Sequence, residues 1–142
     1  MKQLLLFRAI PQAFGGDVFW FTPGGGLLPD ETHERAAARE LREETGIDAP
    51  LGPCVWTRRH VFRFRDRLLD QRERFYVVRV PATEISTDGW EALEREYMEG
   101  GRWWALSEIQ DSDAEFAPLR LPELLPPILA GDYPAEPFDC GV

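Results

Sequence analysis

Residues 39–46 read RELREETG and place Glu40, Glu43 and Glu44 close together on a short stretch of chain. If the stretch is helical, offsets of three and four residues put these carboxylates on one face, with Cβ atoms roughly 5–6 Å apart. Like charges at that spacing repel one another, which leaves two interpretations open. The glutamates either form a solvated face, as most charge runs do, or they surround a cation such as Mg²⁺, which prefers oxygen ligands.

The stretch lies in a segment that carries signals for both ends of a helix. Thr32 suits the N-cap position, and Glu34 suits the positive end of the helix dipole. Three consecutive alanines at 36–38 favour helix, and Gly46 suits the position just after the last turn. The sequence therefore predicts a helix from Thr32 to Thr45.

The other segments alternate between strand and helix signals. Strands are predicted at 3–8, 18–22, 55–65, 74–80 and 102–106, with a polar connection at 66–73. Ser107 is expected to cap a short helix, and a second short helix, interrupted by prolines, is expected over 121–131. This order indicates one mixed α/β domain over residues 1–130, followed by a loose tail over 131–142.

Composition narrows the class of protein. The 142 residues suffice for one domain with its own core. The net charge of -9 argues against stable binding of nucleic acid, which needs a basic surface. Cys54 and Cys140 show neither a disulfide framework nor zinc spacing. No segment has the pattern of a membrane span or a signal peptide, so a cytoplasmic setting without membrane partners is expected.

The glutamates belong to a longer pattern, G-x5-E-x7-R-E-U-x-E-E-x-G-U, in which U is aliphatic. It begins at Gly25, continues through Glu31 and Arg39, and ends at Ile47. This pattern resembles the Nudix box, and every fixed position of the box is filled.

Segments outside the box are also similar to Nudix hydrolases, namely the PGGG loop at 23–26, the strand that ends in Arg8, and RWWALSEI at 102–109. The resemblance covers residues 3–110. It implies a Nudix-like α/β/α sandwich with a mixed β-sheet. The family commonly has one more strand before the one at 3–8, so we expect either a start further upstream, a shorter sheet, or completion by a partner subunit.

The resemblance implies a MutT-like pyrophosphatase that acts on phosphoric anhydride bonds. In that reaction water attacks a phosphorus of a nucleoside diphosphate linked to another group, with Mg²⁺, or Mn²⁺ in its place, as the cofactor. A nucleotide-type small molecule is the expected substrate, and a homodimer is common in the family. The alternative is a Nudix-fold module that binds or senses a nucleotide without cleaving it.

The resemblance also implies roles for the box residues. Glu40, Glu43 and Glu44 are expected to bind the metal ion. Arg39 and Glu31 are expected to orient these carboxylates without contacting substrate.

The general base has several candidates. Glu43 and Glu44 are two of them, because a box glutamate takes this role in some members of the family. In other members the base lies on a later loop, and here Glu94 and Glu96 are favoured within 90–101, beside the alternative that they are solvated loop charges.

Substrate contacts are expected at the PGGG loop (23–26) and at the strand predicted over 3–8. Gly24 and Gly25 allow the backbone to turn sharply and approach a ligand closely, although a tight turn alone would also explain them. Arg8 is a candidate phosphate contact by resemblance, and a surface arginine at a strand end is the other reading.

Three further features leave alternatives open. Eight arginines between 55 and 80 either attract an anionic substrate or pair with the abundant acids. The large aromatic residues are more often core than base-stacking groups; they are Trp56, Phe62, Tyr76, Trp103 and Trp104. Asp30 stands where the family usually has glycine, so the turn before Glu31 needs a residue that tolerates a left-handed conformation, as Asp does.

Overall fold

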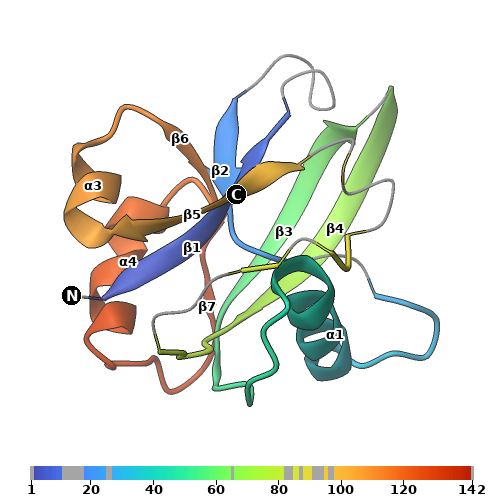
Figure 1. Ribbon diagram of the computed structural model, residues 1–142, viewed down its shortest axis with the longest axis horizontal. Helices are drawn as coiled ribbons and strands as arrows, with labels where there is room; N and C mark the ends of the chain where they lie inside the picture. The colour runs from blue at the N-terminus through green and yellow to red at the C-terminus, as the bar shows by residue number, and fades with distance from the viewer. Residues whose placement is uncertain are drawn as a thin grey trace.

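The fold contains two β-sheets, and each has strands of mixed direction (Figure 1). The computed structural model describes residues 2–10, 18–24, 27–64, 66–81, 85–86, 88–90, 95 and 98–141. The larger sheet has the order β5 (Met98–Ala105), β1 (Gln3–Ala9), β2 (Phe19–Phe21) and β6 (Glu115–Ala117). The smaller sheet has the order β4 (Arg67–Tyr76), β3 (Cys54–Phe64) and β7 (Phe138–Asp139). Each sheet combines antiparallel pairs with one parallel pair, β2 with β6 and β3 with β7.

Helices lie on opposite sides of these strands. Helix α1 (His33–Thr45) lies on one side, and α3 (Leu106–Asp111) and α4 (Leu121–Leu129) lie on the other (Figure 1). The predicted mixed α/β class, with layers of helices around strands, is confirmed. Among the described residues, no helix is both long enough and apolar enough to cross a membrane.

Strand β1 is buried because both of its faces are covered. Alternate residues of a strand point to opposite faces. Leu5 and Phe7 pack with Trp90 in one core cluster, and Leu6 packs with a second cluster that includes Leu121 of α4. The apolar run QLLLF therefore reads as a continuous strand because it faces a core on each side.

Helix α1 has the ends that the sequence predicts. The Thr32 hydroxyl accepts a hydrogen bond from the Arg35 N–H at 3.2 Å, which satisfies one of the free donors of the first turn. Gly46 adopts φ 75°, and its N–H donates to the Arg42 carbonyl. Because glycine takes this left-handed conformation without strain, the helix ends where the box glycine stands.

Strands β3 and β4 form a hairpin, and its second strand is longer and begins earlier in the sequence than predicted. The sequence predicted a polar connection at 66–73 and a strand at 74–80, whereas β4 spans Arg67–Tyr76. Asp66, with φ 63°, lies in the short turn, and the pairing of β3 with β4 reaches Phe64 and Arg67. The prediction was wrong because this ribbon exposes most of its polar residues to solvent, so its strand carries no apolar run.

Two local expectations near the C-terminus also differ from the structure. Ser107 does not cap α3; the N-cap position is Ala105, whose N–H donates to the Glu108 carboxylate at 2.8 Å. The tail predicted to be loose contains β7, which pairs with β3, and Cys140 is fully buried. The Cys140 N–H also donates to the Thr57 carbonyl at 2.9 Å, so the tail is held against the smaller sheet.

Candidate functional site

The three box glutamates lie on the inner side and the flank of α1. Glu40 is 8% exposed and Glu44 is fully buried, although both are acidic. Glu43 is intermediate, with 32% of its side chain exposed. Carboxylates rarely enter a protein interior without a positive charge or several hydrogen bonds. Their placement contradicts the reading of a simple solvated face.

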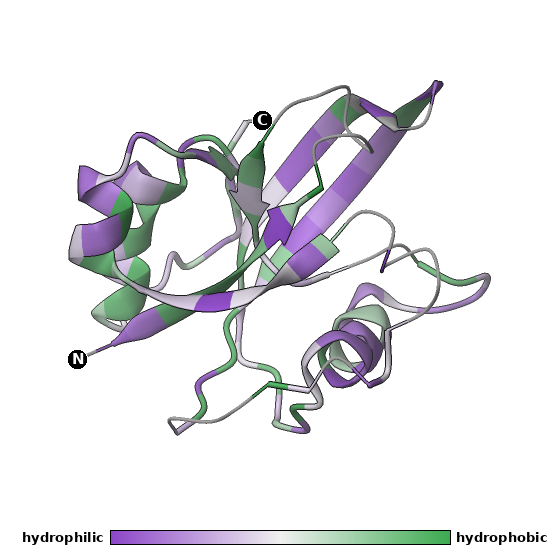
Figure 2. Ribbon diagram, turned by 45° about the horizontal axis from the view of Figure 1, so that its top comes forward, coloured by the Kyte–Doolittle hydropathy of each residue, from purple (hydrophilic) through white to green (hydrophobic). Residues whose placement is uncertain are grey.

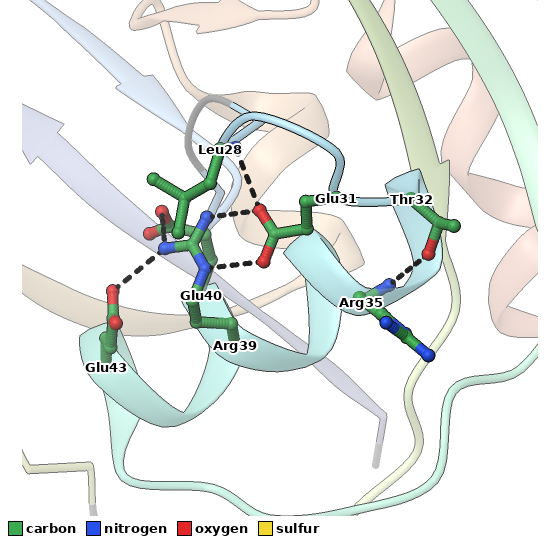
Figure 3. A network of polar contacts seen from close by, with 7 residues as sticks. All are labelled: Leu28, Glu31, Thr32, Arg35, Arg39, Glu40 and Glu43. Carbon is green, nitrogen blue, oxygen red and sulfur yellow. Dashed lines mark hydrogen bonds and ion pairs between the residues drawn. The ribbon is translucent and has the colours of Figure 1, made fainter.

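Arg39 holds this group through one guanidinium (Figure 3). Its Nε and Nη2 atoms donate to the two carboxylate oxygens of Glu31 at 2.8 and 2.9 Å. Its Nη1 atom donates to Glu40 at 2.8 Å and to Glu43 at 3.2 Å. A guanidinium has five donors in a planar fork, so it can contact three carboxylates at once where a lysine cannot.

Glu31 is fixed from two directions. Besides the fork from Arg39, its carboxylate accepts the Leu28 N–H at 3.0 Å. These two donors lower the pKa of Glu31 to about 2, so the group is ionised at neutral pH. Asp30, just before it, adopts φ 63°, the left-handed conformation expected where glycine is missing.

The glycine loop reaches the buried glutamate through its backbone. The Gly24 N–H donates to the Glu44 Oε2 atom at 3.0 Å. A Cβ added at Gly24 would meet no atom within 4 Å in the described part of the chain, so space alone does not require glycine there. Gly25 lies outside the described residues.

The segment before β5 is anchored to the last turn of α1. The Trp90 indole N–H donates to the Glu44 carbonyl at 2.7 Å, and the Ser86 N–H donates to the Thr45 carbonyl at 2.8 Å. A Cβ on Gly89 would lie 2.7 Å from the Glu43 carbonyl oxygen, so only glycine fits this close approach. Trp90 therefore lies beside the turn that carries Glu44, whereas Glu94 and Glu96 lie outside the described residues.

Sequence reasoning missed Gly89 and Trp90 as parts of the site. A glycine followed by a tryptophan in a charged loop was the only signal, and it is a weak one. Their contacts join segments more than 40 residues apart, and no local pattern reports such a contact.

Arg8 is held by a neighbouring strand. Its guanidinium forms an ion pair with Glu99 of β5, and both side chains are partly exposed. By alternation along β1, Arg8 points to the same side as Leu6, whereas Phe7 points toward Trp90 and α1. Its role as a phosphate contact stays a prediction.

The donor chemistry of α1 fits a hard divalent cation. Carboxylate oxygens are the ligands that Mg²⁺ prefers, and Mg²⁺ is commonly bound by one or two carboxylates, waters and substrate phosphates. Within the described residues, no three His, Cys, Asp or Glu side chains are gathered as a ready-made metal site. The group therefore fits as one side of a metal site, with the remaining ligands supplied by water and substrate.

Comparison with known proteins agrees with this geometry. A family model described as NUDIX domain matches residues 1–124. Diphosphoinositol polyphosphate phosphohydrolase 2 of Rattus norvegicus is 40% identical over 72 residues, which cover 51% of this chain and 35% of that protein. RNA pyrophosphohydrolase of Marinomonas sp. (strain MWYL1) is 32% identical over 114 residues, which cover 71% of this chain and 66% of that protein.

A solved structure shares the fold. The crystal structure of a MutT NUDIX hydrolase from Burkholderia pseudomallei aligns with a TM-score of 0.54 at 25% identity, over 75% of each chain. The chain spans 35% and 66% of the lengths of the two curated relatives. Because the family model matches residues 1–124 of the 142, and Arg39 joins Glu31 to the box glutamates of α1, the chain belongs to the NUDIX domain family.

Proposed function

We propose that the chain is a metal-dependent hydrolase of phosphoric anhydride bonds, which cleaves a nucleoside diphosphate linked to another group. The observation that carries this proposal is the single guanidinium of Arg39, which contacts Glu31 just before α1 and Glu40 and Glu43 on α1, the helix that also buries Glu44. Buried carboxylates ordered in this way are costly, and groups arranged at such a cost are found mainly at functional sites.

The residues divide into metal ligands and the groups that orient them. Glu40, Glu43 and Glu44 would hold the cation, Mg²⁺ or Mn²⁺, and Arg39 and Glu31 would keep their carboxylates in place. A cation bound there supplies positive charge to the phosphate oxygens and to the leaving group. Gly24 would fix the rotamer of Glu44 through its N–H.

A carboxylate would accept the proton of the attacking water. Glu43 and Glu44 on α1, and Glu94 and Glu96 on the loop after Trp90, are the candidates. The hydrogen bond from Trp90 to the Glu44 carbonyl supports the loop candidates, because it fixes the start of the loop at the catalytic turn.

The substrate would be a nucleotide-type molecule with a diphosphate bridge. The names of both relatives support cleavage of a phosphoric anhydride, since one acts on a diphosphoinositol polyphosphate and the other is an RNA pyrophosphohydrolase. Only the second name supports a nucleotide-type substrate. Gly24, Gly25 and Arg8 are the proposed substrate contacts, Arg8 on the condition that phosphate displaces Glu99 from it. The cytoplasmic location and the homodimer stay predictions from the sequence.

A hydrolysis screen tests the proposal. The panel holds nucleoside triphosphates, nucleotide sugars, ADP-ribose, dinucleotide cofactors, diadenosine polyphosphates and a 5′-triphosphorylated RNA, each with Mg²⁺ and with Mn²⁺. We expect turnover that is lost in Glu44→Gln and kept in the control Glu123→Gln, which alters an exposed glutamate of α4. Tight binding of one compound without turnover of any would overturn the proposal in favour of a non-catalytic nucleotide sensor.

A further inference from the structure

One face of the β3–β4 hairpin carries a strip of exposed arginines. Cross-strand partners point to the same face, and residues two apart along a strand share it. The register pairs Thr57 with Arg74, Arg59 with Arg72, Val61 with Asp70, and Arg63 with Leu68. We call this face the basic strip, and its exposed members are Arg59, Val61, Arg63, Leu68, Asp70, Arg72 and Arg74.

The strip has more positive charge than its own acids neutralise. Asp70 pairs with Arg59 at 2.7 Å. In the described part of the chain, no carboxylate lies within ion-pairing distance of Arg63, Arg72 or Arg74. Arg72 also lies directly opposite Arg59, a like-charge pair that destabilises a sheet, and Asp70 offsets it only in part, because its single carboxylate interacts with both arginines.

On the other face of the hairpin, an arginine is paired with an acid. Arg58, which is 8% exposed, points to that face and donates to both carboxylate oxygens of Glu73 at 3.0 Å. Arg58 is thus paired inside the fold, whereas Arg67, at the end of the same face, is exposed like the arginines of the strip. Figure 2 shows the hydrophilic residues that run along both strands of the projecting hairpin.

The hairpin also reverses the charge of the molecule. Residues 54–76 contain seven arginines against Asp66, Asp70 and Glu73, a net charge of +4, whereas the whole chain carries -9. The rest of the chain therefore repels polyanions while the hairpin attracts them. Such asymmetry within one chain is typical of a local polyanion site.

The length and position of the strip limit what it could bind. Arg74 and Arg63 mark the two ends of the strip. Arg74 pairs with Thr57, and Arg63 lies six residues further along β3 than Thr57. At ~3.3 Å per residue, the arginines therefore extend over about 20 Å. Tyr76 lies two residues beyond Arg74, on the same face, and its hydroxyl donates to Glu34 in the first turn of α1 at 3.2 Å. The strip therefore starts beside the first turn of α1 and runs away from the helix. Glu44 lies ten residues further along α1 than Glu34, about 15 Å at ~1.5 Å per residue.

We propose that the basic strip binds the phosphate backbone of a single-stranded nucleic acid whose 5′ end carries the phosphoric anhydride to be cleaved. This inference rests on the proposed function and names its substrate class. A ligand that contacts arginines spread over about 20 Å must be a chain, because a single nucleotide or one phosphorylated ring is too short.

Two exposed apolar side chains favour a nucleic acid over inorganic polyphosphate as that chain. Val61 is 50% exposed and Leu68 is 70% exposed, and both lie among the arginines of the strip. Bases of an unpaired strand offer apolar faces to such side chains, whereas inorganic polyphosphate offers none. The strip contains no exposed aromatic side chain, so we expect backbone contacts without a marked sequence preference.

A binding titration tests the assignment. The probe is a fluorescently labelled uridine oligoribonucleotide of about twelve nucleotides, within the range of single-strand site sizes. For Arg63→Gln/Arg72→Gln we expect a Kd about tenfold weaker than wild type, and a salt slope of log Kd smaller by about 1.4, because each lost phosphate contact removes about 0.7. The control Lys2→Gln/Arg120→Gln removes the same charge elsewhere and should bind like wild type.

Hydrolysis provides a second readout. With a 5′-triphosphorylated oligonucleotide, kcat/KM of the strip variant should fall about tenfold, whereas its kcat/KM for a nucleoside triphosphate should equal that of wild type.

Wild-type affinity and salt slope in the strip variant, or an equal loss in the control, would overturn the inference. Displacement of the probe by inorganic polyphosphate at equal phosphate concentration would overturn the choice of nucleic acid. Strip-dependent binding without turnover of any substrate would support the strip and contradict the proposed function.

Discussion

At the scale of single residues, Arg39 holds the carboxylates of the candidate site together. One side chain contacts Glu31, Glu40 and Glu43, so any loss of its planar fork changes all three carboxylates together. In the proposed function, such a residue would act on the reaction through the groups it positions. Its replacement should therefore affect catalysis more than it affects folding.

We expect Arg39→Lys to lower kcat about ten- to a hundredfold, the range found when groups that orient metal ligands are altered. Lysine keeps the charge but cannot donate to three carboxylates in one plane. Steady-state kinetics at saturating Mg²⁺ checks this. Arg35→Lys, at an exposed position of the same helix, serves as the control, and equal activity of the two variants would contradict the role of Arg39.

Glu31 should give the protein a characteristic loss of stability in acid. Its pKa is about 2 in the folded protein against an ordinary value of 4.5, so folding favours the ionised form. That stabilisation is fully present above pH 4.5 and is lost as the pH falls toward 2. The difference in unfolding free energy between wild type and Glu31→Gln should therefore shrink over this range. Urea unfolding at several pH values measures it, and a difference independent of pH would refute the ionised pair.

At the scale of elements, the sequence predicted those pieces whose local signals agree with their tertiary contacts. Helix α1 has an N-cap, alanines and a C-terminal glycine, and β1 is an apolar run between two cores. Strand β4 was placed too late because its polar residues face solvent on a projecting ribbon. The box residues were predictable from their spacing on one helix, whereas Gly89 and Trp90 act through a contact that forms only in the folded chain.

Trp90 joins the loop, the larger sheet and α1, and a substitution can separate its hydrogen bond from its packing. Trp90→Phe keeps a ring near Phe7 but removes the 2.7 Å hydrogen bond to the Glu44 carbonyl. The matched control is Trp104→Phe, because the buried Trp104 indole N–H has no hydrogen-bond partner among the described residues.

We expect Trp90→Phe to lose about 1 kcal/mol more unfolding free energy than Trp104→Phe, the net value of one hydrogen bond. If the proposed function is right, its kcat should also fall, because Trp90 no longer bonds the turn that carries Glu44. Chemical denaturation and steady-state kinetics measure the two effects. Equal losses of stability in both variants would show that the bond to Glu44 contributes nothing.

At the scale of the whole molecule, the net charge does not show how the charged residues are distributed. The net charge of -9 argued against a nucleic-acid partner, yet the hairpin alone carries +4. Only the strand register reveals that the exposed arginines share one face. The same register explains the tail, since β7 adds to the edge of β3 that β4 leaves open, next to Trp56 and Thr57.

The two cysteines report whether that tail stays in place. Cys140 directly follows β7 and is fully buried, whereas Cys54 is only partly buried in β3. Burial raises the pKa of both thiols, so each needs an alkaline buffer to react. Cys140 also needs the tail to leave β3, which breaks the strand pairing and the hydrogen bond to Thr57.

We expect a small thiol reagent to label Cys140 about a hundredfold more slowly than Cys54 in the native protein. Release of the tail breaks two or three backbone hydrogen bonds at about 1 kcal/mol each, and each 1.4 kcal/mol is about a factor of ten in the open population. Cys54→Ala and Cys140→Ala each leave one thiol to follow by mass spectrometry. The two rates should converge in denaturant, where both thiols are exposed. Equal rates in the native protein would mean that the tail is loose after all.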